Sequence, residues 1–131
     1  MQVVGAIIRN HKNEYLLQLR DNNARSFKNC WTFFGGHVED GEELEDALIR
    51  ELSEELSMPA EAIGPIRQVQ VNKDDNGVEQ YVYEIFTDIT IDQLVLGEGA
   101  AMEFIAEDLL FSREFAFNIE KVLRDYISTL E

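Results

Sequence analysis

The 131-residue sequence predicts an α/β fold in which a mixed β-sheet is flanked by helices on both faces. Several short segments are apolar and rich in β-branched or aromatic residues, as strands are. They are interleaved with two well-separated segments whose apolar residues recur at helical spacing. The hydrophobic fraction of 45% is typical of a packed globule, so residues 1–131 are expected to form one domain.

The N-terminal part of the chain is expected to contribute three strands. Residues 2–9 (QVVGAIIR) and 14–20 (EYLLQLR) are apolar and β-prone, and a polar turn separates them. A polar loop over residues 21–29 then leads to a short aromatic strand over residues 31–34, which runs into a Gly-Gly pair.

The rest of the chain is expected to add two helices, a hairpin and one more strand. The predicted elements are a helix over 43–56, strands over 66–73 and 78–89, a strand over 101–106 and a helix over 115–130. The first helix stops before Pro59, because the residue before a proline disfavours helical geometry. An Asp-Asn-Gly turn joins the hairpin strands. Leu48, Ile49, Leu52 and Leu56 share one face of the first helix and are expected to contact the core.

The charge of the chain limits its partners. Twenty-six acidic residues against eleven basic ones give a formal net charge of −15. Such a surface repels nucleic acid and anionic lipid, since phosphate binding needs clustered lysines and arginines. A small anionic ligand would need a cation to mediate its binding, and a divalent metal is the obvious candidate.

A cytoplasmic location is expected. Cys30 is the single cysteine, so no internal disulfide forms and a reducing compartment fits best. No apolar run approaches the ~18 residues of a membrane span. The N-terminus lacks the basic-then-apolar layout of a signal peptide.

The most acidic segment is GGHVEDGEELEDALIRELSEELSM, residues 35–58, with nine acidic residues in twenty-four. Glu51, Glu54 and Glu55 fall on one face of the predicted helix, because residues three and four apart are neighbours on a helix. Carboxylates in this arrangement either form a solvated face or coordinate a hard cation such as Mg²⁺.

The same segment resembles the Nudix box, G-x5-E-x7-R-E-U-x-E-E-x-G-U, in which U is an apolar residue. Eight of the nine specified positions match at the required spacing: Gly36, Glu42, Arg50, Glu51, Leu52, Glu54, Glu55 and Met58. A chance match is on the order of one in a hundred million per register. Residues 36–58 are therefore identified as a Nudix box. Ser57 replaces the last glycine, and either adopts a left-handed conformation at a cost of ~1–2 kcal/mol or ends the helix differently.

The resemblance implies a fold, an activity and a metal site. Nudix hydrolases have an α/β/α sandwich fold and cleave a phosphoanhydride in a nucleoside diphosphate linked to another group, with Mg²⁺ or Mn²⁺. In this sequence Glu54 and Glu55 would bind metal, and Glu51 would bind metal or act as base towards the attacking water. Arg50 would hold a glutamate in place, so Glu51, Arg50 and Glu54 are the expected catalytic residues. The carbonyl of Gly35 would supply a further metal oxygen.

Two other residues of the motif precede the arginine and the glutamates of its core. Gly36 begins the box, and Glu42 either serves the motif directly or only favours the dipole at the start of the helix.

Residues outside the box also have expected roles. Many family members supply another glutamate from a distant loop, and Glu98 is the candidate here because it lies between two glycines, which allow close approach of the backbone. Its competitor, Glu103, alternates with apolar residues in a predicted strand and is expected to face solvent. Arg20 and Arg25 are candidates for contact with a substrate phosphate.

The small size of the chain favours, by analogy, a nucleoside triphosphate as substrate, with a monophosphate and pyrophosphate as products. A nucleotide-sugar, ADP-ribose or coenzyme A pyrophosphatase is the alternative. A Nudix-fold module that binds nucleotides without catalysis is a different class, and the intact arginine and glutamates of the box argue against it. The expected partner is a small-molecule nucleotide, with no nucleic acid and no membrane, bound by a monomer or homodimer.

Overall fold

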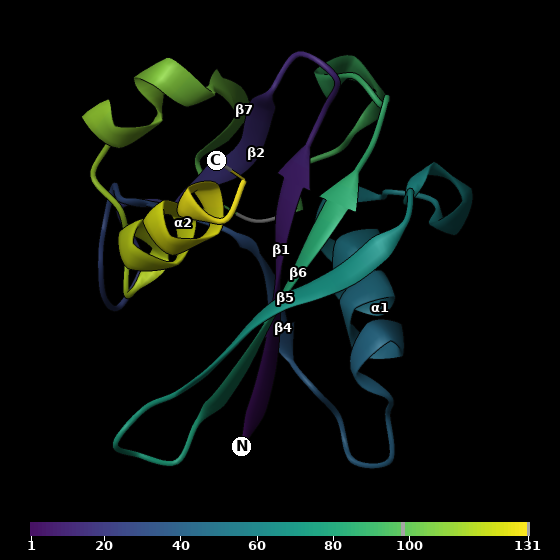
Figure 1. The fold of residues 1–131 in the computed structure, drawn as a ribbon, viewed down its shortest axis with the longest axis vertical. Helices are drawn as coiled ribbons and strands as arrows, with labels where there is room; N and C mark the ends of the chain where they lie inside the picture. Colours follow the sequence, from purple (N-terminus) through teal and green to yellow (C-terminus); the bar gives the residue numbers. More distant parts are fainter. Residues whose placement is uncertain (98, 131) are drawn as a thin grey trace.

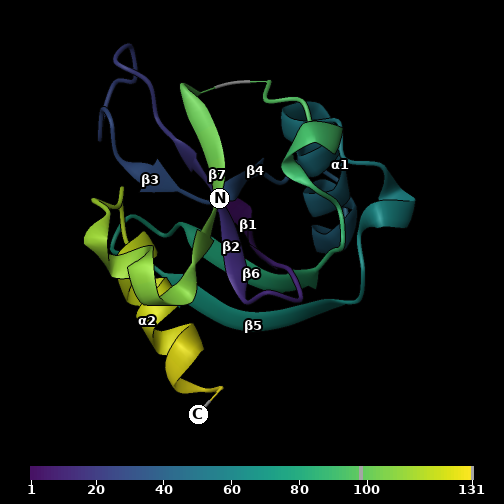
Figure 2. The same ribbon diagram turned by 90° about the horizontal axis from the view of Figure 1, so that it is seen from above.

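The computed structural model describes residues 1–97 and 99–130, which form a mixed β-sheet between two helices (Figure 1). The strands are β1 (Gln2–Arg9), β2 (Glu14–Leu19), β3 (Trp31–Thr32), β4 (Phe34–His37), β5 (Ile66–Lys73), β6 (Glu79–Phe86) and β7 (Ala101–Ala106). The α-helices are α1 (Leu44–Leu56) and α2 (Ile119–Ser128), and short 3-10 helices span Ala60–Ala62, Ile91–Gln93 and Glu107–Ser112. Figures 1 and 2 show α1 and α2 on opposite sides of the sheet, which confirms the predicted α/β/α arrangement.

Strand β1 is the centre of the sheet. The described strands follow the order β3-β2-β1-β6-β5, while β4 also pairs with β1 and β7 with β2. Strand β1 runs parallel to β6 along its whole length and antiparallel to β2 and β4. Its other edge is divided, because β4 pairs with residues 3–6 and β2 with residues 8–9. This division places the glycines of β4 beside the first half of β1.

Alternate residues of the strands enter two separate cores. The core under α1 includes Val4, Ala6, Ile8, Leu16, Phe34, Ala47, Leu48, Leu52, Leu56, Tyr83 and Ile85. The core under α2 includes Ile7, Tyr15, Leu17, Val82, Ile105, Val122, Leu123 and Tyr126. Neighbouring residues of one strand therefore pack against different helices, as the two-residue period of a strand requires.

Helix α2 begins at Ile119, so the prediction of a helix from residue 115 was wrong at its start. Residues 114–116 instead pair with the edge of the sheet: the Trp31 N–H donates to the carbonyl of Glu114 at 2.8 Å, and Ala116 N–H donates to the carbonyl of Trp31 at 2.9 Å. Phe117 then has a φ of 51°, which no right-handed helix contains. The long-range pairing with Trp31 overrides the helical pattern.

Smaller differences concern other boundaries. The predicted aromatic strand is interrupted at Phe33 and divides into β3 and β4. The predicted strand over 78–89 is shorter, and β6 ends at Phe86. In α1, Ala47 is fully buried while Ile49 is only partly buried, so the predicted core face was wrong at Ile49.

The C-terminal end of α1 has a left-handed cap. Ser57 has φ 53° and ψ 31°, and the Met58 N–H returns to the carbonyl of Leu52 at 3.4 Å. Of the two predicted alternatives for Ser57, the strained left-handed conformation is therefore the one adopted. The loop after Ile91–Gln93 covers this end of the helix, since the Gly97 N–H donates to the carbonyl of Glu55 at 2.7 Å.

Candidate functional site

The two glycines of β4 allow close contact between the sheet and α1. A Cβ atom on Gly35 would lie 2.0 Å from the carbonyl oxygen of Val4. A Cβ atom on Gly36 would lie 2.6 Å from Oε1 of Glu51. Any larger residue would displace a neighbouring strand or the Glu51 carboxylate, so the Gly-Gly pair is what lets this carboxylate pack against β4.

Arg50 connects the acidic side chains of the box. Its Nε donates to Glu42 at 2.8 Å, and its Nη2 donates to the other oxygen of the same carboxylate at 3.1 Å. Its Nη1 donates to Glu51 at 3.0 Å and to Glu54 at 3.3 Å. Its Nη2 also donates to the backbone carbonyl of His37 at 3.0 Å. One guanidinium therefore joins the loop before α1 to the glutamates on the helix.

The charges of this cluster stabilise one another. The hydrogen bond from Arg50 holds the pKa of the Glu42 carboxyl below its usual range, and the carboxylate of Glu42 raises the pKa of Arg50. Arg50 is partly buried, with 24% of its side chain exposed, and Glu39 approaches it at 3.8 Å. Glu42 thus anchors Arg50 from a position before the first turn of α1, in addition to any effect on the helix dipole.

The glutamates of the box differ in exposure and contacts. The side chain of Glu51 is 15% exposed, between Arg50 and Gly36, whereas that of Glu54 is 60% exposed. Glu55 points toward β4, where its Oε2 accepts a hydrogen bond from the Gly35 N–H at 3.4 Å. The three carboxylates therefore share one side of α1, with Glu51 and Glu55 turned toward β4 and Glu54 toward solvent.

The carboxylates of Glu51, Glu54 and Glu55 are chemically suited to bind a hard divalent cation. Carboxylate oxygens are the ligands that Mg²⁺ and Mn²⁺ prefer. Within residues 1–97 and 99–130, no group of three or more His, Cys, Asp and Glu side chains converges on one point. Magnesium is typically held by only one or two carboxylates, with substrate phosphates and water completing its octahedral shell. The glutamates present fit that smaller requirement.

A cavity of about 700 Å³ lies beside this cluster. Gly35, Gly36 and Glu55 form part of its wall, and its lining includes the cations Arg20 and Lys73. In a chain with a net charge of −15, these cations provide a local attraction for an anionic ligand.

Another part of the cavity wall consists of side-chain amides that are hydrogen-bonded to one another. Asn72 donates to Oε1 of Gln80 at 3.0 Å, and Asn118 donates to the same oxygen at 2.9 Å. All three residues line the cavity, as does Phe117. Sequence reasoning missed these residues and Lys73, because they come from β5, β6 and the start of α2 and no local motif connects them.

The predicted site residues outside the box differ in whether they line the cavity. Arg20 lines the cavity, whereas Arg25 is exposed and is not part of the lining that the described residues form. Glu98 lies outside the described residues. Glu103 is exposed, as predicted, and accepts two hydrogen bonds from Arg113 at 3.1 and 3.2 Å.

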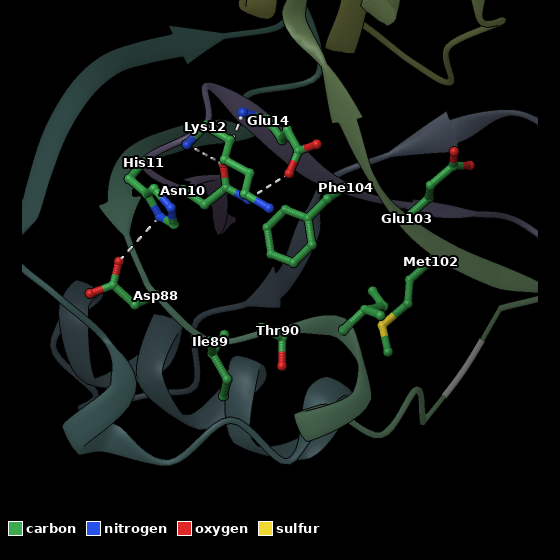
Figure 3. Close-up of a pocket in the computed structure, with 11 residues that line it drawn as sticks. Asn10, His11, Lys12, Glu14, Asp88, Ile89, Thr90, Met102, Glu103 and Phe104 are labelled. Atoms are coloured by element: carbon green, nitrogen blue, oxygen red, sulfur yellow. Dashed lines mark hydrogen bonds and ion pairs between the residues drawn. The ribbon is translucent and has the colours of Figure 1, made fainter.

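A second cavity, of about 440 Å³, lies at the far end of β1 and β2 (Figure 3). Phe104 and Met102 of β7 project toward it, and His11 approaches Asp88 at 3.6 Å on its rim. None of the box glutamates belongs to its described lining. The candidate site is therefore the cavity beside α1 and β4.

No helix within the described residues is both long and apolar enough to cross a membrane.

Comparisons with known proteins agree with the geometry. The family model of the NUDIX domain matches residues 1–126. The chain is 32% identical over 117 residues to the ADP-ribose pyrophosphatase of Methanocaldococcus jannaschii. The aligned region covers 88% of this chain and 66% of that protein, so the chain spans slightly less than two thirds of this relative's length.

Solved structures show the same fold. The crystal structure of DR0079 from Deinococcus radiodurans has a TM-score of 0.78 at 22% identity, covering 95% of this chain and 81% of that one. The MutT structure from the study of Aliivibrio salmonicida and Vibrio cholerae has a TM-score of 0.75 at 23% identity, and the match covers 97% of this chain and 95% of that one. With the family match over nearly the whole chain and the predicted box in place on α1, this protein belongs to the NUDIX family.

Proposed function

We propose that this NUDIX domain hydrolyses a phosphoanhydride bond in a nucleoside diphosphate linked to another group, with Mg²⁺ or Mn²⁺ as cofactor. The observation that carries the proposal is the contact of Arg50 with Glu42, Glu51 and Glu54 beside a cavity that contains Arg20 and Lys73. A solvated acidic face would not need a partly buried arginine that orders its carboxylates.

Glu54 and Glu55 are the proposed metal ligands, together with the Gly35 carbonyl and, from sequence alone, Glu98. Glu51 either binds metal as well or acts as the base. The bound metal would neutralise the pyrophosphate and lower the pKa of a water. These residues supply only oxygen ligands, as a hard cation requires. Within an acidic chain this neutralisation is also what admits an anionic substrate.

The chain's own residues have distinct parts in the proposed reaction. Arg50 positions Glu51 and Glu54, and Arg20 and Lys73 attract the phosphates. A water attacks phosphorus, its proton passes to a carboxylate for which Glu51 is the candidate, and the bond from phosphorus to the bridging oxygen breaks. The leaving group, which is pyrophosphate or a phosphate monoester according to the substrate and the phosphorus attacked, carries away the electron pair of that bond.

Two classes of substrate are candidates for this reaction. The size of the domain favours a nucleoside triphosphate, which would yield a monophosphate and pyrophosphate. The 32% identity to an ADP-ribose pyrophosphatase favours ADP-ribose, which would yield AMP and ribose 5-phosphate. Both reactions break the same kind of bond, so the box chemistry serves either.

The test is a panel of nucleoside triphosphates, ADP-ribose, nucleotide sugars and coenzyme A, each incubated with Mg²⁺ and, in parallel, with EDTA. We expect phosphorylated products from at least one compound, and none in EDTA. Binding without turnover across the whole panel would instead identify a nucleotide-binding module and refute the proposed hydrolysis.

A further inference from the structure

Two phenylalanines form an exposed aromatic pair at the cavity beside α1. The ring centroids of Phe27 and Phe117 are 4.7 Å apart, and the rings are tilted by 52°. The residues are 45% and 55% exposed, although apolar rings are normally buried. Phe117 also lines the cavity.

The backbone at both positions is strained. Phe27 and Phe117 each have a φ of 51°, in the left-handed region that bulky residues rarely adopt. Folding gains little from burying rings that remain about half exposed, so burial does not explain two strained positions in one contact. Strain of this kind is concentrated at binding sites, where the surrounding structure maintains it.

Arg20 contacts the aromatic pair. Its guanidinium carbon lies 5.0 Å from the centroid of the Phe117 ring, and its Nε donates to the carbonyl of Ser26 at 3.2 Å. Arg20 therefore links the loop that carries Phe27 to the ring that lines the cavity. Arg20 itself also lines the cavity.

The lining of the cavity therefore combines two chemically different parts. Gly35, Gly36 and Glu55 line it beside the acidic face of α1, and Phe117 contributes an aromatic surface. A nucleotide has the matching polarity, with anionic phosphates at one end and a planar base at the other. Bases stack favourably on aromatic side chains and on arginine, whatever their sequence.

We infer that Phe117, supported by Phe27 and Arg20, is the platform on which the planar base of the nucleotide stacks. The inference rests on the proposed function for the chemistry at the phosphate end. It assigns recognition of the base to residues outside the box, on the loop between β2 and β3 and immediately before α2.

The test measures binding separately from hydrolysis. The probe is α,β-methylene-ADP with Mg²⁺, which cannot be cleaved at its methylene bridge, titrated by calorimetry. We expect Phe117→Leu to raise Kd by roughly 10-fold or more, because stacking on an aromatic ring is lost. Phe117→Trp should bind at least as tightly as wild type, and Phe27→Leu should have a smaller effect than Phe117→Leu.

Phe86→Leu is the matched control. Phe86 is also an exposed phenylalanine, at 41%, and it also lies under an arginine, with Arg9 5.2 Å from its ring centroid. It is not among the described residues that line this cavity. Its substitution should leave Kd unchanged, and thermal melting would confirm that every variant is folded.

The outcomes separate this inference from the proposed function. Phe117-dependent binding without hydrolysis of any substrate would support the platform and refute only the proposed reaction. Hydrolysis by a folded Phe117→Leu variant with wild-type Kd for the probe would overturn the platform alone. Failure of wild type to bind the probe, or an equal loss of binding in Phe86→Leu, would also overturn it.

Discussion

Arg50 holds its place through geometry as well as charge. Its guanidinium binds both oxygens of Glu42 while its other donors reach Glu51 and Glu54. A lysine ammonium is a single point charge and cannot reproduce this planar set of bonds. The order of the carboxylates therefore depends on arginine specifically, not only on a positive charge.

We predict that Arg50→Lys lowers kcat by roughly 10- to 100-fold and raises the Mg²⁺ concentration needed for half-maximal activity, because positioning of catalytic groups is worth this much. Steady-state kinetics at several Mg²⁺ concentrations would measure both effects. Arg124→Lys is the control, since Arg124 pairs with Glu120 on the exposed side of α2. Activity of Arg50→Lys within twofold of wild type would show that charge alone suffices.

Glu54 and Glu103 offer a matched pair for testing the acidic face. Both are exposed glutamates bound to an arginine, but only Glu54 stands on the box face of α1. Glu54→Gln keeps the size of the side chain and removes its charge, so we predict that kcat falls by orders of magnitude with the fold intact. Glu103→Gln should be nearly silent. A folded Glu54→Gln enzyme with more than about a tenth of wild-type kcat would exclude Glu54 as a required ligand.

The C-terminal end of α1 is strained at Ser57, which has a left-handed backbone conformation. A left-handed conformation costs an L-residue ~1–2 kcal/mol, and glycine adopts it without that cost. We predict that Ser57→Gly stabilises the protein by about 1 kcal/mol and leaves activity unchanged. Thermal or urea unfolding would measure the change.

The control lies on the same helix. Ser53 is exposed within α1, where glycine is ~1 kcal/mol less favourable than alanine and serine lies between the two. Ser53→Gly should therefore destabilise the protein by about 0.5 kcal/mol. Equal destabilisation by both substitutions would mean that Ser57 is not strained in solution.

The elements differ in how far sequence could predict them. One helix contains Arg50, Glu51, Glu54 and Glu55. The helical period of the sequence was therefore sufficient to predict that their side chains lie close together. The start of α2 was mispredicted, because the pairing of Trp31 with residues 114–116 is a long-range contact that leaves no local pattern. Lys73 and Phe117 reach the cavity through tertiary packing and were missed for the same reason. The role of Glu98 stays a prediction from sequence.

A buried carboxylate connects α2 to the sheet. Glu84 of β6 is 5% exposed and accepts hydrogen bonds from Arg67 of β5, at 2.8 Å, and from the hydroxyl of Tyr126 on α2. Arg9 of β1 donates to the same hydroxyl at 2.9 Å. Burial by itself would raise the pKa of Glu84, but the hydrogen bonds from Arg67 and Tyr126 outweigh it and lower this pKa.

The lowered pKa has a consequence for stability at acid pH. A carboxyl whose pKa is lower in the folded state stabilises the fold fully above its unfolded pKa of about 4.3. That contribution is lost as the pH falls below this value and through the folded pKa. We predict that Glu84→Gln destabilises the protein at pH 7, by about 1–3 kcal/mol, and by progressively less as the pH falls. Urea unfolding of both proteins between pH 7 and pH 3 would test this, and a constant difference across the range would contradict it.

The reaction proposed for this protein is a metal-dependent attack of water on phosphorus at the acidic face of α1. The most direct measurement is ³¹P NMR of the products formed in ¹⁸O-water with Mg²⁺, from the best substrate of the panel. We expect an isotope-shifted signal for one phosphorylated product, and no product when EDTA replaces Mg²⁺. Products whose ³¹P signals are all unshifted, or the same products in EDTA, would contradict this mechanism.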